Sequence, residues 1–218
     1  MGLSDTPAFP LPRSARLAVF ASGRGSNLAS LIEAFPADPP AALARVALVV
    51  VNVPAAPALR QAQAAGVATR LICWTRYSGS RDAFERDALA TLDRAGIDLV
   101  CLAGFMRILS PAFTRRWAGR IVNVHPSLLP AYPGLHPQRR ALEAGERESG
   151  CTIHLVDAGV DSGPIVLQRR VPIFDGDDEE ALSARILEME HRAYPEAVRT
   201  LLQGDAHERS ETASGASP

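Results

Sequence analysis

The chain has 218 residues, of which 47% are hydrophobic and 22% charged, and its formal net charge is −1. This length suits one α/β domain and is short for two, and the composition is ordinary for a packed globular protein. The balanced charge gives no electrostatic reason to expect nucleic acid or an anionic membrane as a partner. Apolar runs such as Val46–Val51 are strand-sized, and the first fifteen residues lack the apolar core of a signal peptide.

Both ends of the chain, residues 1–15 and 204–218, lack apolar periodicity, and we expect them to be disordered. Between them, helical spacing is expected over residues 27–35, 57–65, 81–95 and 179–202, with the last helix interrupted near Pro195. Apolar runs predict seven strands, over residues 17–21, 46–51, around 71–72, 99–102, 121–125, 152–156 and 165–171.

Strands that alternate with helices predict an α/β fold: one domain over residues 16–203 with a doubly wound, mostly parallel seven-stranded sheet and helices on both faces. The N-terminal half is expected to be Rossmann-like. Ligands of such sheets bind beyond the carboxyl ends of the strands. This rule directs attention to the loops after Ala21, Leu102, His125 and Val156.

Three cysteines, at 73, 101 and 151, show no metal-ligand spacing, and each lies in or beside an apolar run. We expect them to be small buried side chains in a reducing, cytoplasmic environment, and we predict no metal site.

A glycine-rich turn, Ser22–Asn27, joins the first strand to the first helix. Such a turn brings backbone N–H groups and the positive end of a helix close to an anion, typically a phosphate. In the simpler alternative, Ser26 or Asn27 only caps the helix. A dinucleotide-binding dehydrogenase would need a third glycine at Leu28 and an acidic residue near Asn52, and both are missing.

The segment Val122–Ser127 places an amide and an imidazole two residues apart at a predicted strand end. Because side chains alternate along a strand, Asn123 and His125 point to one face, roughly 6.5–7 Å apart. An amide N–H can stabilise an oxyanion while an imidazole moves a proton, which suits acyl-type transfer. A polar strand end satisfied by its neighbouring loops is the equally weighted alternative. A buried acidic partner would favour catalysis, and the loop that holds Asp157 and Asp161 offers one, although Asp157 fits a plain turn role better.

Read together, several segments resemble the glycinamide ribonucleotide formyltransferase family, from about residue 16 to 203. The matching segments are Ser22–Leu28, Leu102–Phe113, Ile121–Leu135, Gly150–Val156, Asp161–Gln168 and Glu190–Pro195. The resemblance implies the formyltransferase fold and transfer of a formyl group from 10-formyltetrahydrofolate, a co-substrate, to the amine of glycinamide ribonucleotide in purine synthesis. It implies small-molecule substrates, no nucleic acid, no membrane, no metal, and a monomer or homodimer.

The resemblance also implies roles for individual residues. Asn123, His125 and Asp161 match the family's catalytic trio, and the implied ribonucleotide contacts are Gly25, Ser26, Asn27 and Glu190. The implied folate contacts are Arg81, Met106, Arg107, Ile108, Leu109, Asn123, Asp157, Ala158, Gly159, Val160 and Asp161.

Three further expectations concern the site. His154 either faces the same pocket in a supporting role or is a structural strand histidine, with equal weight. Asp161 beside His125 is expected to raise the imidazole pKa, so that Asn123 and protonated His125 stabilise the oxyanion. Four apolar side chains after Leu102 are expected to line an aromatic-sized pocket, namely Phe105, Met106, Ile108 and Leu109.

The chain departs from the family pattern at Arg24, where a small polar residue is common, and at Val53-Pro54. Related enzymes are the alternatives. A methionyl-tRNA formyltransferase would be expected to carry a basic C-terminal domain, and a formyltetrahydrofolate hydrolase an extra N-terminal domain. A non-catalytic folate- or nucleotide-binding module is a further alternative, but it would not explain the presence of Asn123, His125 and Asp161.

Overall fold

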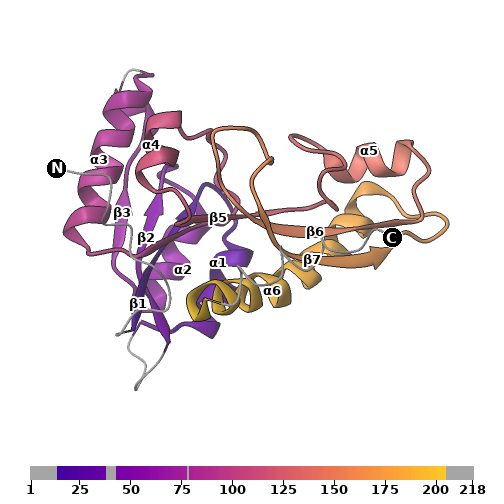
Figure 1. The fold of residues 1–218 in the computed structure, drawn as a ribbon, viewed down its shortest axis with the longest axis horizontal. Coiled ribbons are helices and arrows are strands. Elements are labelled where there is room, and N and C mark those ends of the chain that lie inside the picture. Colours follow the sequence, from indigo (N-terminus) through magenta and orange to yellow (C-terminus); the bar gives the residue numbers. More distant parts are fainter. Residues whose placement is uncertain (1–13, 38–42, 78, 205–218) are drawn as a thin grey trace, which may run out of the picture.

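The computed structural model describes residues 14–37, 43–77 and 79–204. Within them the seven predicted strands form one sheet in the order β3-β2-β1-β4-β5-β6-β7, and β6 runs antiparallel to both of its neighbours (Figure 1). The doubly wound, mostly parallel sheet is therefore confirmed. Its strands are β1 (Ala15–Ala21), β2 (Ala44–Val51), β3 (Thr69–Leu71), β4 (Leu99–Leu102), β5 (Ile121–His125), β6 (Glu148–Leu155) and β7 (Ile165–Pro172).

The four predicted helices are present as α1 (Ser26–Ala34), α2 (Pro57–Ala64), α3 (Arg81–Arg94) and α6 (Glu179–Gln203). The expected interruption at Pro195 was wrong, because α6 continues through it. A proline removes one helical N–H bond, but the buried neighbours Ala193, Tyr194 and Val198 hold this stretch against the sheet. Three short elements were not predicted: a 3₁₀ turn η1 (Trp74–Tyr77), α4 (Pro111–Arg116) and α5 (Pro137–Glu143).

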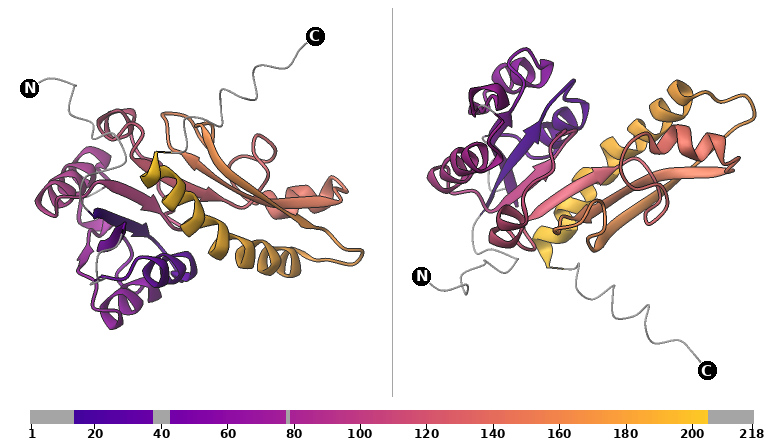
Figure 2. Two further views of the ribbon diagram at one scale, coloured as in Figure 1. Left: turned by 60° about the horizontal axis from the view of Figure 1, so that its bottom comes forward. Right: turned by 90° about the horizontal axis from the view of Figure 1, so that it is seen from above.

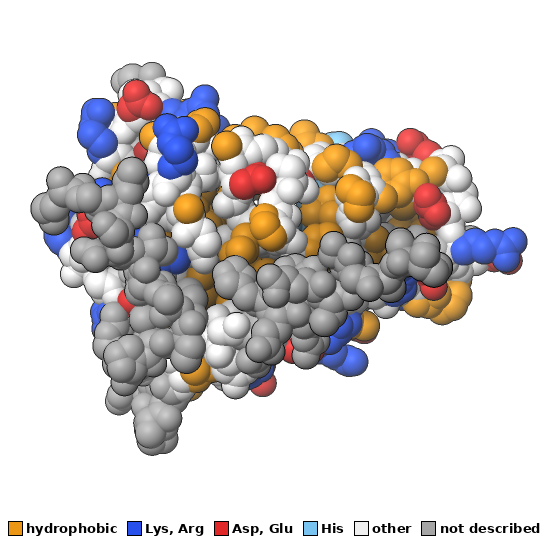
Figure 3. Space-filling model, in the orientation of Figure 1, with side chains coloured by type: hydrophobic (Ala, Val, Ile, Leu, Met, Phe, Trp, Pro, Cys, Tyr) orange, Lys and Arg blue, Asp and Glu red, His pale blue; other side chains and the backbone are white. Residues whose placement is uncertain are grey.

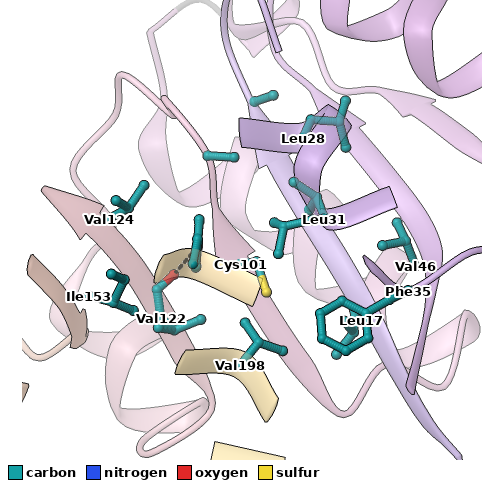
Figure 4. Packing of buried hydrophobic residues seen from close by; sticks show 14 of the residues in the cluster. Leu17, Leu28, Leu31, Phe35, Val46, Cys101, Val122, Val124, Ile153 and Val198 are labelled. Carbon is teal, nitrogen blue, oxygen red and sulfur yellow. Dashed lines mark hydrogen bonds between the residues drawn. The ribbon is translucent and has the colours of Figure 1, made fainter. Parts of the chain in front are cut away.

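The core on one face of the sheet lies under α1, α2 and α6. Alternate residues of the strands, such as Leu17, Cys101 and Val122, meet Leu28 of α1 and Val198 of α6 (Figure 4). The apolar runs of β1, β2 and β4 are buried on both faces, as a parallel sheet requires. Figure 2 shows α6 lying along β6 and β7, and its contacts with these strands agree.

The core on the opposite face lies under α3 and α4 and is smaller. It draws on β1, β2 and β4 but on only the first residue of β5, Ile121. The remaining part of this face, over β5 to β7, is covered by loops rather than by α3 or α4. Asn123 and His125 follow Ile121 at intervals of two, so they point to this part of the face. The fold thus leaves a place for polar chemistry beside a packed core.

The ends of the predicted domain need small corrections. Ala15 already belongs to β1, and Gly204 caps α6 in a left-handed conformation. The rest of the two ends expected to be disordered lies outside the described residues. All three cysteines are buried free thiols, as expected, and burial raises the pKa of Cys101 and of Cys151 to about 12. No helix in the described part of the chain is long and apolar enough to cross a membrane.

Candidate active site

Three polar side chains from adjacent strands meet on the part of the sheet face that loops cover. His154 on β6 lies directly opposite Asn123 on β5, and its Nε2 is 3.2 Å from Asn123 Nδ2. His125 lies two residues further along β5 and is also buried. The prediction that Asn123 and His125 share one face is therefore confirmed. His154 shares this face and contacts Asn123, and its ring is buried with a partner at both nitrogens, which is compatible with either of its two alternatives.

Asp161 closes this group from above the sheet. Because β6 is antiparallel, the end of β6 lies beside the start of β5, and the loop that follows returns over the face. Asp161 adopts a left-handed φ of 51° and places Oδ2 3.3 Å from His125 Nδ1 and Oδ1 3.5 Å from His154 Nε2. Its Oδ2 also accepts a bond from the Gly134 N–H at 2.9 Å. Burial raises the pKa of this carboxyl, but the contact with His154, the Gly134 N–H and the attraction to a protonated His125 together lower it below its usual value.

Asp161 raises the pKa of His125, as expected, but it does not decide the net direction of the shift. Burial lowers the pKa of the His125 imidazole below its ordinary value of 6.5, and it outweighs the Tyr132 carbonyl and the Asp161 carboxylate, which act in the opposite direction. The ring nevertheless has acceptors at both nitrogens, since Nε2 lies 3.0 Å from the Tyr132 carbonyl oxygen and Nδ1 faces Asp161. The site therefore favours neutral His125 at rest and offers partners to the imidazolium once a proton arrives.

The hydrogen bonds of His154 assign its tautomer and orient Asn123. Nδ1 of His154 lies 2.9 Å from the Leu155 carbonyl oxygen, which can only accept, so the ring proton is on Nδ1. In the neutral ring Nε2 then accepts one hydrogen of the Asn123 amide, and Nε2 can donate to Asp161 Oδ1, 3.5 Å away, only when the ring is protonated. The hydrogen bond from Asn123 fixes its Nδ2 on the His154 side and leaves its second N–H hydrogen for another acceptor.

The loop after β5 is held by hydrogen bonds between its backbone and two side chains of neighbouring strands, which the sequence did not reveal. Thr152 Oγ1 donates to the Ser127 carbonyl at 2.7 Å and accepts from the Leu129 N–H at 3.0 Å, beside the cis Leu129–Pro130 bond. Gln168 donates to the Leu129 carbonyl at 2.6 Å. These bonds place the Tyr132 carbonyl against His125. Backbone acceptors carry no side-chain signature, so only the structure identifies them.

The glycine-rich turn is shaped by its backbone. Gly25 caps α1 with a left-handed φ of 83°, and a Cβ added there would lie 2.9 Å from Ala58 Cα, so only glycine fits. The simple capping alternative for Ser26 or Asn27 was wrong, because no side chain caps α1. The N–H groups of its first turn are therefore left for water or for an anion.

Glu190 lies buried beside this turn, where its Oε2 accepts a 2.6 Å bond from Asn27 Nδ2. Burial raises the pKa of Glu190 to about 7, although the bond from Asn27 lowers it. The amide oxygen of Asn27, Oδ1, is buried with no partner among the described residues. The pair lies next to the open N-terminus of α1.

This environment predicts a pH-dependent effect of Glu190→Gln on stability. The carboxyl pKa is about 7 in the folded chain and near 4.5 when unfolded, so its contribution to stability is full below pH 4.5 and is lost as pH rises to 7. We expect the variant to be more stable than the parent at pH 8, by up to about 3 kcal/mol, and no more stable at pH 4.5. The new amide can also donate to Asn27 Oδ1. Urea unfolding at the two pH values measures this, and an equal effect at both would contradict it.

The apolar side chains after β4 differ in their exposure to solvent. Met106 and Ile108 are 70% and 69% exposed, as expected of a binding surface. Leu109 is instead buried and Phe105 half-buried, and both pack against the core under α3 and α4. Between the exposed residues, the Arg107 guanidinium stacks over Trp74, 4.4 Å from the ring centre.

Other implied contacts surround this segment. Arg81 is exposed at the first position of α3. In the loop after β6, Asp157 Oδ1 accepts from the Gly159 N–H and from Ser162 Oγ, which confirms its turn role, while Ala158, Gly159 and Val160 are exposed. Figure 3 shows hydrophobic side chains gathered along the middle of one face of the molecule. No cluster of three metal-ligating side chains occurs in the described ranges.

Comparison with known proteins identifies the family. The model of the formyl transferase family matches residues 15–198. The chain belongs to this family. It is 43% identical over 188 residues to the phosphoribosylglycinamide formyltransferase of Escherichia coli, covering 86% of this chain and 87% of the relative. A solved phosphoribosylglycinamide formyltransferase from Brucella melitensis has a TM-score of 0.80 and 43% identity, covering 94% of this chain and 99% of the other.

Other relatives are much longer than this chain. It is 48% identical over 204 residues to the trifunctional purine biosynthetic protein adenosine-3 of Drosophila melanogaster, covering 94% of this chain. The match spans only 15% of that relative. The formyl transferase portion is thus what the two proteins have in common.

Proposed function

We propose that the chain transfers the formyl group of 10-formyltetrahydrofolate to the amine of glycinamide ribonucleotide. The observation that carries the proposal is the group formed by Asn123, His125 and Asp161, in a member of the formyl transferase family. Asp161 contacts His125 directly, and His154 links it to Asn123. The uncapped N-terminus of α1 suits the phosphate of the ribonucleotide. The exposed segment around Met106 and Ile108 suits the flat pterin ring.

The geometry supports a proton-relay mechanism. The neutral amine attacks the formyl carbon, and the negative oxygen that forms accepts the free N–H hydrogen of Asn123. His125, neutral at rest with its proton on Nε2 toward Tyr132, takes up the amine proton at Nδ1, through a water held by Asp161. Asp161 stabilises the imidazolium. The C–N bond to folate then breaks, and His125 returns the proton to the departing folate nitrogen.

The pH dependence of turnover tests the resting state of His125. Because burial lowers the pKa of His125, we expect kcat to fall only as pH decreases through a value below 6.5. Asp161 raises this pKa, so Asp161→Asn should move the acid limb to still lower pH. The pKa of the acid limb is obtained from rates measured between pH 5 and 9 with both substrates saturating. A kcat that falls as pH rises through 6.5 would show that the imidazolium, not the neutral ring, is the required resting form.

Arg24 adds a cation to the proposed phosphate loop. Its side chain is exposed, and its carbonyl accepts a 3.0 Å bond from Gln61, which fixes the backbone but not the guanidinium. We expect Arg24→Ala to raise the KM for the ribonucleotide by about three- to tenfold with little change in kcat, and to weaken its salt dependence. Steady-state kinetics at low and high ionic strength measure this. An unchanged KM at low salt would place the guanidinium away from the phosphate.

The proposal is tested by incubating the purified chain with 10-formyltetrahydrofolate, with and without glycinamide ribonucleotide, while absorbance follows the deformylated folate. Turnover that requires the ribonucleotide supports it. Turnover without the ribonucleotide would indicate a hydrolase, and folate binding without turnover a binding module. The buried free thiols fit a reducing compartment, and we propose the cytoplasm.

A further inference from the structure

The segment between β4 and α4, residues 105–109, is called here the folate loop. Its two end residues are anchored in the core: Phe105 packs edge-on against Phe20, with ring centres 5.3 Å apart, and Leu109 is only 6% exposed. The three residues between them, which the proposed function assigns to folate, face outward. The positions of the outward-facing side chains therefore depend on how firmly the two ends of the loop are anchored.

The start of the folate loop is fastened to the glycine-rich turn. The Met106 N–H donates to Ser22 Oγ at 2.9 Å, and the Ser22 N–H donates to the Gly104 carbonyl at 3.2 Å. These two bonds join the loop to the end of β1. Neither bond reaches the other end of the folate loop, which leads into α4.

The far end of the loop is fastened by a buried carboxylate. Glu85 on α3 is 5% exposed, and no Arg or His pairs with it among the described residues. Its Oε1 accepts the Ser110 N–H at 2.7 Å, and its Oε2 accepts a short bond from Ser110 Oγ. Ser110 Oγ in turn caps α4 by accepting the Phe113 N–H at 3.1 Å. Two oxygens that hold one residue fix its orientation as well as its position.

A buried carboxylate without a cation is costly, and packing alone does not require one here. A serine cap is sufficient to start α4 by itself. What the carboxylate adds is a rigid link between α3 and the end of the folate loop. Arg81, the other implied folate contact on α3, lies one helical turn before Glu85 and therefore on the same side of the helix. The link thus sets the spacing between two groups of folate contacts.

We propose that Glu85 is a positioning residue for the folate co-substrate, acting through Ser110 to hold the folate loop ready to bind. The inference rests on the proposed function and adds to it a residue that touches neither substrate. Glu85→Ala removes both bonds to Ser110 and leaves the Ser22 bonds intact. Only the far end of the loop is released, so the defect should be specific to folate.

The test compares Glu85→Ala with the full-length parent and with Asp93→Ala. Asp93 lies on the same helix and forms only an exposed ion pair with Arg116, so its removal is a matched loss of charge. For Glu85→Ala we expect about a tenfold higher KM for 10-formyltetrahydrofolate, the size expected for lost bonds to a buried charged group. The KM for the ribonucleotide and kcat should change by less than about threefold. Glu85→Gln, which can still accept the Ser110 N–H, should recover most of the loss.

A binding measurement separates this inference from the proposed function. Tetrahydrofolate is titrated against tryptophan fluorescence, which Trp74 beneath Arg107 makes sensitive to the folate loop. The Kd of Glu85→Ala should rise in step with its KM. If the parent neither binds tetrahydrofolate nor turns over, the proposed function fails. If the parent does both and the folded variant binds as tightly, or loses both substrates equally, Glu85 is only structural. If Glu85→Ala does not fold, two other variants decide between these outcomes. Glu85→Gln keeps the Ser110 N–H bond and should raise only the folate KM, and only slightly. Ser110→Ala loses the Oγ bond to Glu85 and the cap of α4, and it should raise only the folate KM, by more than Glu85→Gln does.

Discussion

Replacing Asp161 with Asn is expected to lower kcat by about 10²–10⁴, the range for loss of a group that manages a proton in the transition state. The substitution is nearly isosteric, and the amide oxygen can still accept the Gly134 N–H. What is lost is the charge that faces His125 at 3.3 Å and stabilises its protonated form. The loss should therefore appear in kcat rather than in either KM, measured at saturating concentrations of both substrates.

Asp175→Asn is the matched control for this variant, since Asp175 is exposed and lies between β7 and α6, away from the site. Its kcat should equal that of the parent. If Asp161→Asn kept turnover within a factor of about three of the control, the charge could not have the role assigned to it.

Replacing Asn123 with Ala is expected to lower kcat by about 10²–10³, as for loss of an oxyanion donor. Asn123→Asp gives the sharper comparison, because it keeps the shape but replaces the N–H donor with an oxygen. His154 Nε2, assigned as an acceptor, would then face a second acceptor. We expect Asn123→Asp to be at least as impaired as Asn123→Ala.

Thermal unfolding provides the control, since both variants should remain folded with an intact sheet. Substantial activity in Asn123→Asp, together with low activity in Asn123→Ala, would show that Asn123 acts through packing rather than by donating a hydrogen bond. The assigned tautomer of His154 would then also need revision.

Much of the fold can be predicted from the helical periodicity of apolar residues and from the alternation of side chains along strands. The apolar runs of β1, β2 and β4 predict buried parallel strands, and the two-residue spacing of Asn123 and His125 predicts their common face. The short helices α4 and α5, of six and seven residues, are too brief to show helical periodicity. Pro195 was misjudged because tertiary packing outweighs a local breaking tendency.

The sequence suggests which residues form the candidate site, but it does not predict the net pKa of the groups in it. The sequence indicates that a carboxylate lies near His125, but the net pKa depends on how deeply the ring is buried, and only coordinates give that. Phe105 and Leu109 are as hydrophobic as Met106 and Ile108. Only the packing against α3 shows that the first two belong to the core and the other two to the surface. The Tyr132 carbonyl and the Glu85–Ser110 link depend on contacts between distant segments.

In the proposed reaction the formyl group moves directly from folate to the amine of the ribonucleotide. We would supply 10-formyltetrahydrofolate with ¹³C in the formyl group, together with glycinamide ribonucleotide, and follow the label by NMR and mass spectrometry in a single turnover. We expect the label to appear as a formamide on the ribonucleotide in a one-to-one ratio with tetrahydrofolate. Label released as free formate, with the ribonucleotide unchanged, would contradict it.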